Sequence, residues 1–209
     1  MTDAPSNNLP PAASGLIQRA KDILLKPKET WPIIAAEPAT TQSIYVPYVA
    51  ALAAIGPLAG LIGGQVFGIT VLGVTYHPPL AGALVSAVVS YFLSLATVFI
   101  LALVIDGLAP NFGGQKNQIQ ALKVAAYTGT AGWIGGIFGL IPALALIGAL
   151  FGLYGLYILY LGLPVLMKAP EEKAFGYTAV VIIVAIVLFL VVGAIVGALA
   201  APSLLTVRG

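Results

Sequence analysis

Three long runs of this sequence contain no Asp, Glu, Lys or Arg, and they constrain the fold more than any other feature. The runs are Pro38 to Ile105, Val124 to Met167 and Ala174 to Val207. A helix needs about 20 apolar residues to cross a membrane, so the first two runs can each hold two crossings and the third can hold one. Charged residues make up 8% of the chain, which is far below the share in soluble domains. We predict an all-α polytopic membrane bundle of five transmembrane helices.

Proline, glycine and polar residues divide these runs into spans. We place the breaks at residues 75–79, which contain two prolines, and at residues 139–142. Residues 66–74 are apolar but contain Gly68 and Gly73, so they either extend the first span or form a loop. The five spans are expected within a domain covering residues 38–209, near residues 44–64, 80–105, 120–140, 143–167 and 175–200.

The positive side chains predict the orientation of the bundle. Lys and Arg in short loops are retained on the cytoplasmic side of a membrane. With five crossings, one side receives eight of the nine cations, and only Arg208 falls on the other. The N-terminus is therefore expected in the cytoplasm and the C-terminus outside. The eight cations are Arg19, Lys21, Lys26, Lys28, Lys116, Lys123, Lys168 and Lys173.

The region before the first uncharged run has two parts. Residues 1–13 are rich in Pro, Asn and Ala, which is typical of a disordered tail. Residues 14–37 are expected to form an amphipathic interfacial segment, in which Ser14 caps a helix that ends before Pro27. This segment either lies flat on the cytoplasmic leaflet or packs against the cytoplasmic ends of the spans. Its predicted membrane-interface residues are Leu16, Ile17, Ile23, Leu24 and Trp31, the last as an anchor with one wet ring edge.

Three tyrosines recur every three residues in the fourth span. Counting back from Lys168 at about 1.5 Å per residue, Tyr160 lies about 12 Å and Tyr154 about 21 Å into the membrane. Lipid tails offer no acceptor, so we expect these phenols and that of Tyr157 to bond to another helix or to enclosed water. Pro164 leaves the carbonyl of Tyr160 without its helical donor. The row either joins helices or lines a ligand cavity.

The charged residues nearest the spans are the other candidates for binding. Asp106 and Lys123 fall at the cytoplasmic ends of the second and third spans. They either form an interfacial pair or extend to the interface, or they contact a headgroup or partner. The turn between the last two spans carries Lys168, Glu171, Glu172 and Lys173.

Glycines spaced by four predict close helix packing, because small residues let backbones approach where no hydrophobic effect drives association. We expect most of these contacts to be internal, although self-association is also open. The glycines form a triplet and four pairs: Gly56, Gly60 and Gly64; Gly132 and Gly136; Gly135 and Gly139; Gly148 and Gly152; Gly193 and Gly197.

The sequence offers no catalytic motif. It has no Cys, and its one histidine, His77, lies in a loop without carboxylates nearby, so we expect no metal, cofactor or enzymatic activity. The cations lie at span ends rather than in a basic patch, so we expect no nucleic-acid partner.

Two stretches carry a resemblance to a known family. The chain resembles the Yip superfamily of five-span membrane proteins in these two stretches. The first is residues 154–173, which contain the motifs LYLGLP and Pro-Glu-Glu-Lys, and the second is residues 25–38, which contain Trp31 and Glu37. The resemblance implies a cytosolic N-terminus, five helices and an external C-terminus. Eukaryotic relatives act with prenylated Rab-type GTPases. This chain lacks their Asp-Leu-Tyr-Gly-Pro motif, so we do not predict a Rab-type GTPase as its partner. The short loops resemble the bacterial branch, which implies the inner membrane.

Two functions follow as hypotheses. The first is a non-enzymatic membrane scaffold or adaptor, whose cytoplasmic face contacts lipids, other integral membrane proteins or a second copy of itself. That face would comprise the interfacial helix, the Asp106 loop and the turn at residues 168–173. The alternative is a small channel or a lipid or solute carrier with a cavity lined by Tyr154, Tyr157 and Tyr160.

Overall fold

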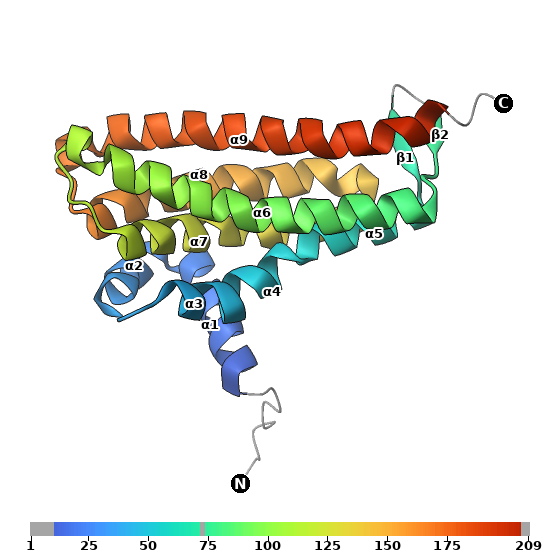
Figure 1. Ribbon diagram of the computed structural model, residues 1–209. Helices are drawn as coiled ribbons and strands as arrows, with labels where there is room; N and C mark the ends of the chain where they lie inside the picture. The colour runs from blue at the N-terminus through green and yellow to red at the C-terminus, as the bar shows by residue number, and fades with distance from the viewer. Residues whose placement is uncertain (1–10, 72–73, 206–209) are drawn as a thin grey trace, which may run out of the picture.

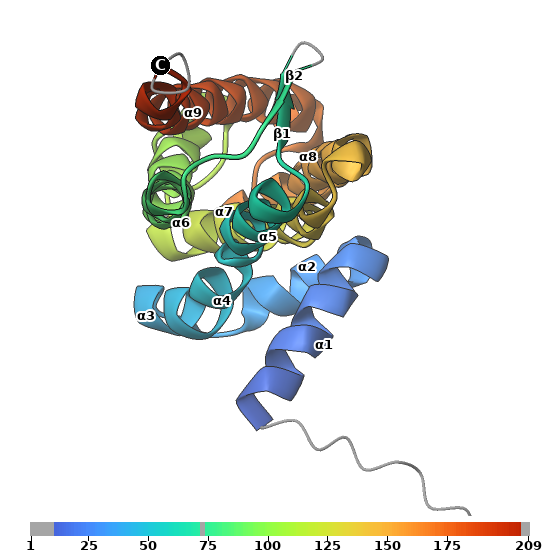
Figure 2. The ribbon, with the colours of Figure 1, turned by 90° about the vertical axis from the view of Figure 1, so that its right-hand side faces the viewer.

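The computed structural model describes residues 11–71 and 74–205, and nearly all of them are helical (Figure 1). The long helices lie side by side in a bundle that Figure 2 shows nearly end-on. They are α5 (Ile55–Val66), α6 (Leu80–Leu108), α7 (Gln118–Gly135), α8 (Ala145–Met167) and α9 (Glu171–Leu205). Four segments are long and apolar enough to cross a membrane, namely Thr41–Val66, Leu80–Phe112, Pro142–Met167 and Glu171–Leu199. The prediction of a helical membrane bundle is confirmed at this level.

The N-terminal region forms two helices, α1 (Pro11–Leu25) and α2 (Pro27–Ala36). Pro27 separates them and begins α2, because proline lacks the amide hydrogen that an interior position would need. Helix α1 begins at Pro11 rather than after Ser14, so the predicted boundary of the tail is three residues too late; residues 1–10 lie outside the described residues. Helix α1 runs across the direction of the bundle (Figures 1 and 2).

The first membrane segment is broken into short pieces. Thr40 and Ser43 form a reciprocal capping box, in which each side chain accepts from the other residue's backbone N–H, at the start of α3 (Thr41–Ile44). A π-helical turn η1 (Tyr45–Val49) and α4 (Ala50–Ala53) then lead into α5. Pro47 and Pro57 cannot donate backbone hydrogen bonds, which accounts for the breaks in regular helix.

A β-hairpin joins α5 to α6. Strands β1 (Ile69–Val71) and β2 (Val74–Tyr76) pair antiparallel. Gly68 precedes them at a φ of 76°, and a side chain at this position would contact Thr75 and His77. Of the two possibilities for residues 66–74, the described residues after Val66 match the loop, since α5 ends at Val66 and β1 and β2 follow it.

The remaining connections alternate between the two ends of the bundle. The α6–α7 connection, which contains η2 (Ala109–Phe112), and the α8–α9 turn lie at one end, here called the charged end (Figure 1). The β-hairpin and the α7–α8 connection lie at the opposite end. The latter contains η3 (Gly136–Leu140) and η4 (Pro142–Leu144), separated at Ile141 as the predicted break required.

Glycines allow the closest helix contacts. A Cβ on Gly136 would lie 2.8 Å from the Cα of Gly56, and a Cβ on Gly63 would lie 2.2 Å from the carbonyl oxygen of Gly139. These contacts confirm internal packing for part of the glycine pattern. By contrast, nothing in the described structure lies within 4 Å of the position that a Cβ on Gly193 or Gly197 would take.

Helix α7 lies at the centre of the core. It packs between α6 and α8, and nine of its 18 residues are buried. The tightly packed small residues of this helix include Ala121, Ala125, Ala126 and Ala131. Short side chains at these positions let the neighbouring helices approach closely.

Candidate functional site

Trp31 joins α2 to α8. Its side chain is fully buried, and its indole N–H donates to the carbonyl oxygen of Ile158 at 3.1 Å. A Cβ on Gly162 would lie 2.5 Å from the indole ring, so this glycine makes room for it. The ring also meets Tyr127 of α7 edge-on. The prediction of an interfacial anchor with one wet edge is wrong, because the N–H that would face water is bonded inside the protein.

Helix α1 also packs on the bundle. Ile23 is fully buried, Leu24 packs against the core, and the hydroxyl of Tyr154 donates to the carbonyl oxygen of Leu24 at 2.6 Å. Of the two alternatives for this segment, these contacts match packing against the spans. Ile17 remains 37% exposed and Leu16 is half-buried, so contact of this end of α1 with a bilayer stays a prediction.

Lys123 is buried where α2 ends. Only 2% of it is exposed, and its ammonium donates to the carbonyl oxygens of Ile34 at 2.7 Å and Glu37 at 2.5 Å. Gln120 donates to the carbonyl oxygen of Ala35 at 2.9 Å. The last carbonyls of a helix lack internal donors and carry partial negative charge, so a cation there is stabilising. Lys123 therefore holds α2 against α7, and the prediction that it pairs with Asp106 or extends to the interface is wrong.

An ion pair closes the same junction. The guanidinium of Arg19 in α1 donates to the carboxylate of Glu37, which follows α2. Nearby, the hydroxyls of Tyr48 and Thr130 lie 2.7 Å apart and join η1 to α7. The sequence pattern did not indicate these contacts, since Arg19 and Glu37 are 18 positions apart on opposite sides of the helix break at Pro27. The only available signal for Glu37 was its place in the family-like stretch.

Asp106 lies at the charged end, near the end of α6. Its Oδ1 atom is buried and has no hydrogen-bond partner among the described residues. The neighbouring hydroxyl of Tyr177 donates to the carbonyl oxygen of Ile105, and the ring of Tyr177 stacks on Phe112 at 4.9 Å. These contacts join the start of α9 to the α6–α7 connection.

The three predicted tyrosines do not share one cavity. Tyr154 is bonded to α1, but Tyr157 and Tyr160 are 44% and 42% exposed on the outside of α8. Neither of these two hydroxyls has a hydrogen-bond partner among the residues that the structure describes. The predicted cavity walled by all three is therefore wrong: a turn of 300° per three residues carries the row from an inner to an outer face.

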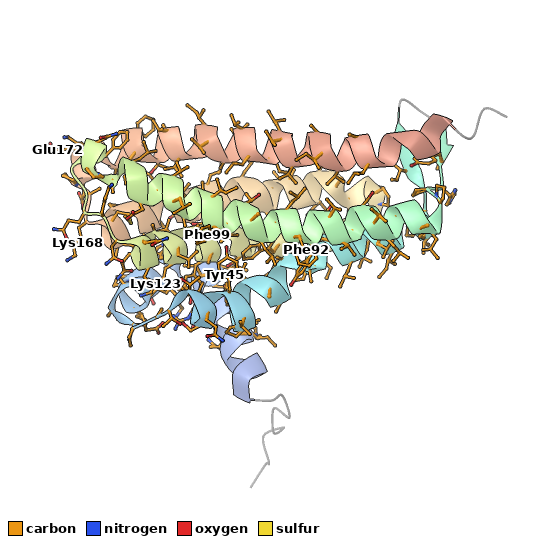
Figure 3. The ribbon with its side chains drawn as sticks, in the orientation of Figure 1. Tyr45, Phe92, Phe99, Lys123, Lys168 and Glu172 are labelled. Atoms are coloured by element: carbon orange, nitrogen blue, oxygen red, sulfur yellow. The ribbon has the colours of Figure 1, made fainter. Side chains whose placement is uncertain are left out.

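The α8–α9 turn exposes its charges. Lys168 ends α8 in the left-handed conformation, with a φ of 52°. It is exposed together with Glu171, Glu172 and Lys173, and none of the four belongs to an ion pair within residues 11–71 and 74–205. Figure 3 shows Lys168 and Glu172 at the tip of the bundle, whereas Lys123 lies between α7 and the N-terminal helices.

A pocket of about 350 Å³ lies beside this turn. It is formed by α2, α8 and the start of α9, and it contains Tyr160, Pro164 and Glu171 from the predicted set. Lys28 and Trp31 of α2 also line it, together with the apolar residues Leu161, Val165 and Ala174. The structure therefore brings together two regions that the sequence analysis treated separately, because α2 folds back onto α8.

Comparison with known proteins identifies the family of the chain. A family model described as the Yip1 domain matches residues 21–193. No curated protein and no solved structure matches the chain significantly. The matched residues include the Lys123 junction, the tyrosine row and the charged turn, and they cover well over half of the sequence. The resemblance found in the sequence is confirmed, and the chain belongs to the Yip1 domain family.

Proposed function

We propose that this protein is a non-enzymatic membrane scaffold or adaptor that contacts lipids and other membrane proteins through its charged end. The observation that carries this proposal is the separation of surfaces on the bundle. The connections at the charged end expose Lys116, Lys168 and Lys173, whereas α6 and α9 expose apolar side chains such as Phe92 and Phe189. Figure 3 shows Lys168 at the tip of the bundle and Phe92 along the side of α6. Such a bundle is anchored by its sides and presents one polar face.

Five crossings are part of the proposal, with α7 as the third. Helix α7 is not among the four segments that qualify by length and apolar composition. Its neighbours α6 and α8 surround it, and a helix shielded from lipid can carry Lys123, Thr128 and Thr130 at little cost. The alternation of connections between the two ends supports this count. We accordingly propose a cytoplasmic charged end, a C-terminus on the other side, and a bacterial inner-membrane location.

Single-cysteine labelling tests the crossing of α7, because the natural sequence has no Cys. Lys116→Cys lies before α7, Lys168→Cys follows α8, and His77→Cys lies at the opposite end. With five crossings, an impermeant maleimide reaches positions 116 and 168 from the same side and position 77 from the other. Labelling of 116 and 168 from opposite sides would mean that α7 does not cross.

Site-specific photocrosslinking tests the docking face. A benzophenone amino acid at Lys116 or at Glu172 is expected to give discrete protein adducts in intact membranes, and one at His77 is expected to give none. Exchange of Lys168 and Lys173 for Glu should remove the adducts while leaving the thermal unfolding midpoint unchanged. Equal adducts from both ends would contradict a partner surface at the charged end.

The carrier hypothesis loses its main support. It required an enclosed cavity lined by three tyrosines, and two of them are exposed on the outer side of α8. We therefore retain the scaffold as the proposed function.

A further inference from the structure

The pocket beside the charged turn combines groups of different chemistry. Lys28 of α2, Tyr160 of α8 and Glu171 of α9 line it, together with the apolar side chains of Pro164 and Val165. Trp31 also borders it, and the buried bond of its indole to α8 fixes α2 in place. A lysine, a glutamate and a tyrosine thus line a single pocket of about 350 Å³.

Both charges in this pocket are unpaired. The ion pairs within the described residues are Arg19–Glu37 and Lys26–Glu29, so neither Lys28 nor Glu171 belongs to one. Opposite charges that line one pocket without joining each other leave separate places for an anionic and a cationic group. A zwitterionic ligand with a spacer between its charges would satisfy both.

The hydroxyl of Tyr160 needs a hydrogen-bond acceptor deeper in the membrane than the two charges. Tyr160 lies eight residues before Lys168, or about 12 Å along the helix. Its hydroxyl has no hydrogen-bond partner among the described residues, unlike that of Tyr154, which is bonded to Leu24. A hydroxyl in an apolar environment needs an acceptor, and free lipid tails offer none at this depth. A phospholipid whose headgroup is seated inside the pocket, below the general headgroup level, would bring an ester carbonyl to Tyr160.

We infer that this pocket binds a phospholipid whose headgroup carries a phosphate and a primary ammonium, as in phosphatidylethanolamine. The phosphate lies at Lys28, the ammonium donates to Glu171, and an ester carbonyl accepts from Tyr160. The acyl chains continue along α8 beyond Tyr160, away from the charged end, where Leu153 and Leu150 are exposed. This inference rests on the proposed function, since it places the charged end at a lipid headgroup layer.

Other headgroups fit less well. A choline headgroup has no N–H to donate to Glu171, and holding it by cation–π contacts takes exposed aromatic faces. Trp31 is fully buried, so Tyr160 is the exposed ring among the pocket residues. An anionic headgroup such as glycerol phosphate brings no cation for Glu171. The pocket should therefore select ethanolamine.

Native mass spectrometry of the full chain tests the inference. The protein in mild detergent is equilibrated with equal amounts of phosphatidylethanolamine, phosphatidylcholine and phosphatidylglycerol that share the same acyl chains. We expect the wild type to retain the ethanolamine lipid preferentially. Glu171→Gln should reduce that retention about tenfold and bring it to the level of the choline lipid, because a charge-assisted hydrogen bond is lost. Lys28→Gln should weaken retention of all three lipids.

Matched variants control for general effects of charge. Glu172→Gln and Lys26→Gln change exposed residues next to the pocket residues and should leave the lipid preference unchanged. Tyr160→Phe should weaken retention of the ethanolamine lipid several-fold without altering the unfolding midpoint. Equal retention by the Glu171 and Glu172 variants, or wild-type preference for the glycerol lipid, would overturn the inference.

A further arm separates a lipid from a soluble ligand. Excess phosphoethanolamine without acyl chains should fail to displace the bound lipid, because the Tyr160 contact and the chains are missing; displacement would overturn the assignment to a lipid. The photocrosslinking of protein partners is independent of this readout. If the otherwise unchanged protein gives no adducts from its charged end but keeps its lipid selectivity, the docking proposal alone is rejected. If it gives the adducts but shows no lipid selectivity, the lipid site alone is rejected.

Discussion

Helices α7 and α9 show opposite relations between composition and position. Helix α7 carries two glutamines, a lysine, two threonines and three glycines, and half of it is buried. Helix α9 is almost wholly apolar, yet only 6% of its most apolar stretch is buried in the protein. Its buried residues within the described part are Ala174, Tyr177, Thr178 and Val181, all near its start.

The difference follows from the solvent that each helix meets. A helix facing lipid must present apolar side chains along its length, since lipid offers no hydrogen bonds. A helix surrounded by other helices gains more from small residues and from polar side chains that bond across the interface. The helix that organises this bundle is therefore the one that apolar composition is least able to identify. The following predictions test this contrast between α7 and α9.

Removal of the buried cation of α7 should have the largest effect. Lys123→Met would leave the carbonyls of Ile34 and Glu37 without donors, and we expect a loss of about 3 kcal/mol in the free energy of unfolding. Lys173→Met, on the exposed start of α9, should have no measurable effect. Reversible unfolding in detergent micelles measures both. Equal stability of the two variants would show that Lys123 does not fix α2 to α7.

The glycines of the two helices give a matched pair. A Cβ on Gly135 of α7 would lie 2.5 Å from the Cβ of Phe151 and 2.9 Å from the carbonyl oxygen of Gly148. Gly135→Ala should therefore cost about 2 kcal/mol through overpacking. Gly193→Ala in α9 meets open space and should stabilise the helix by a few tenths of a kcal/mol to about 1 kcal/mol. The same unfolding measurement compares the two variants. A loss of stability in Gly193→Ala would contradict the open space around this residue and would indicate a closely packed partner there.

The contrast between packed and unpacked glycines can also be tested within α8, because Gly162 packs against Trp31 whereas Gly152 has no neighbour within 4 Å. Gly162→Ala would collide with the ring of Trp31, and we expect a loss of about 1 to 2 kcal/mol together with a changed environment of that indole. Gly152→Ala has nothing within 4 Å and serves as the control. With Trp133 replaced by Phe in both variants, the near-ultraviolet circular dichroism of the Trp31 indole reports the shift. An unchanged spectrum in the Gly162 variant would contradict the docking of α2.

The smallest expected effect concerns two buried threonines. Thr130 of α7 bonds to Tyr48 of another segment, whereas Thr178 of α9 donates to Ala174 of its own helix. Thr130→Val should cost about 1 kcal/mol, because the hydroxyl of Tyr48 loses its partner. Thr178→Val should change stability less, since the carbonyl of Ala174 keeps its helical donor. A larger loss from Thr178→Val would reverse the proposed ranking of the two helices.

Much of the helical layout could be predicted because it depends on local chemistry. The expected span near residues 80–105 corresponds to α6, and the break at residues 139–142 corresponds to the interruption at Ile141. Both follow from the length of apolar runs and from the backbone limits of proline and glycine. The roles of Trp31, Lys123 and Tyr157 could not be predicted in this way. Each depends on which face of a helix meets α2, and no short-range pattern contains that information.

The sequence by itself determined that this chain is a helical membrane protein of the Yip1 domain family with its breaks at proline- and glycine-rich positions. These properties arise from side chains acting on their own backbone and on the surrounding solvent. Only the tertiary structure decided that α7 is central, that α1 and α2 pack onto it and onto α8, and that Lys28, Tyr160 and Glu171 line one pocket. Those outcomes depend on contacts between residues far apart in the sequence, as in the bond from Trp31 to Ile158 across 127 positions, and such contacts exist only after the helices have packed.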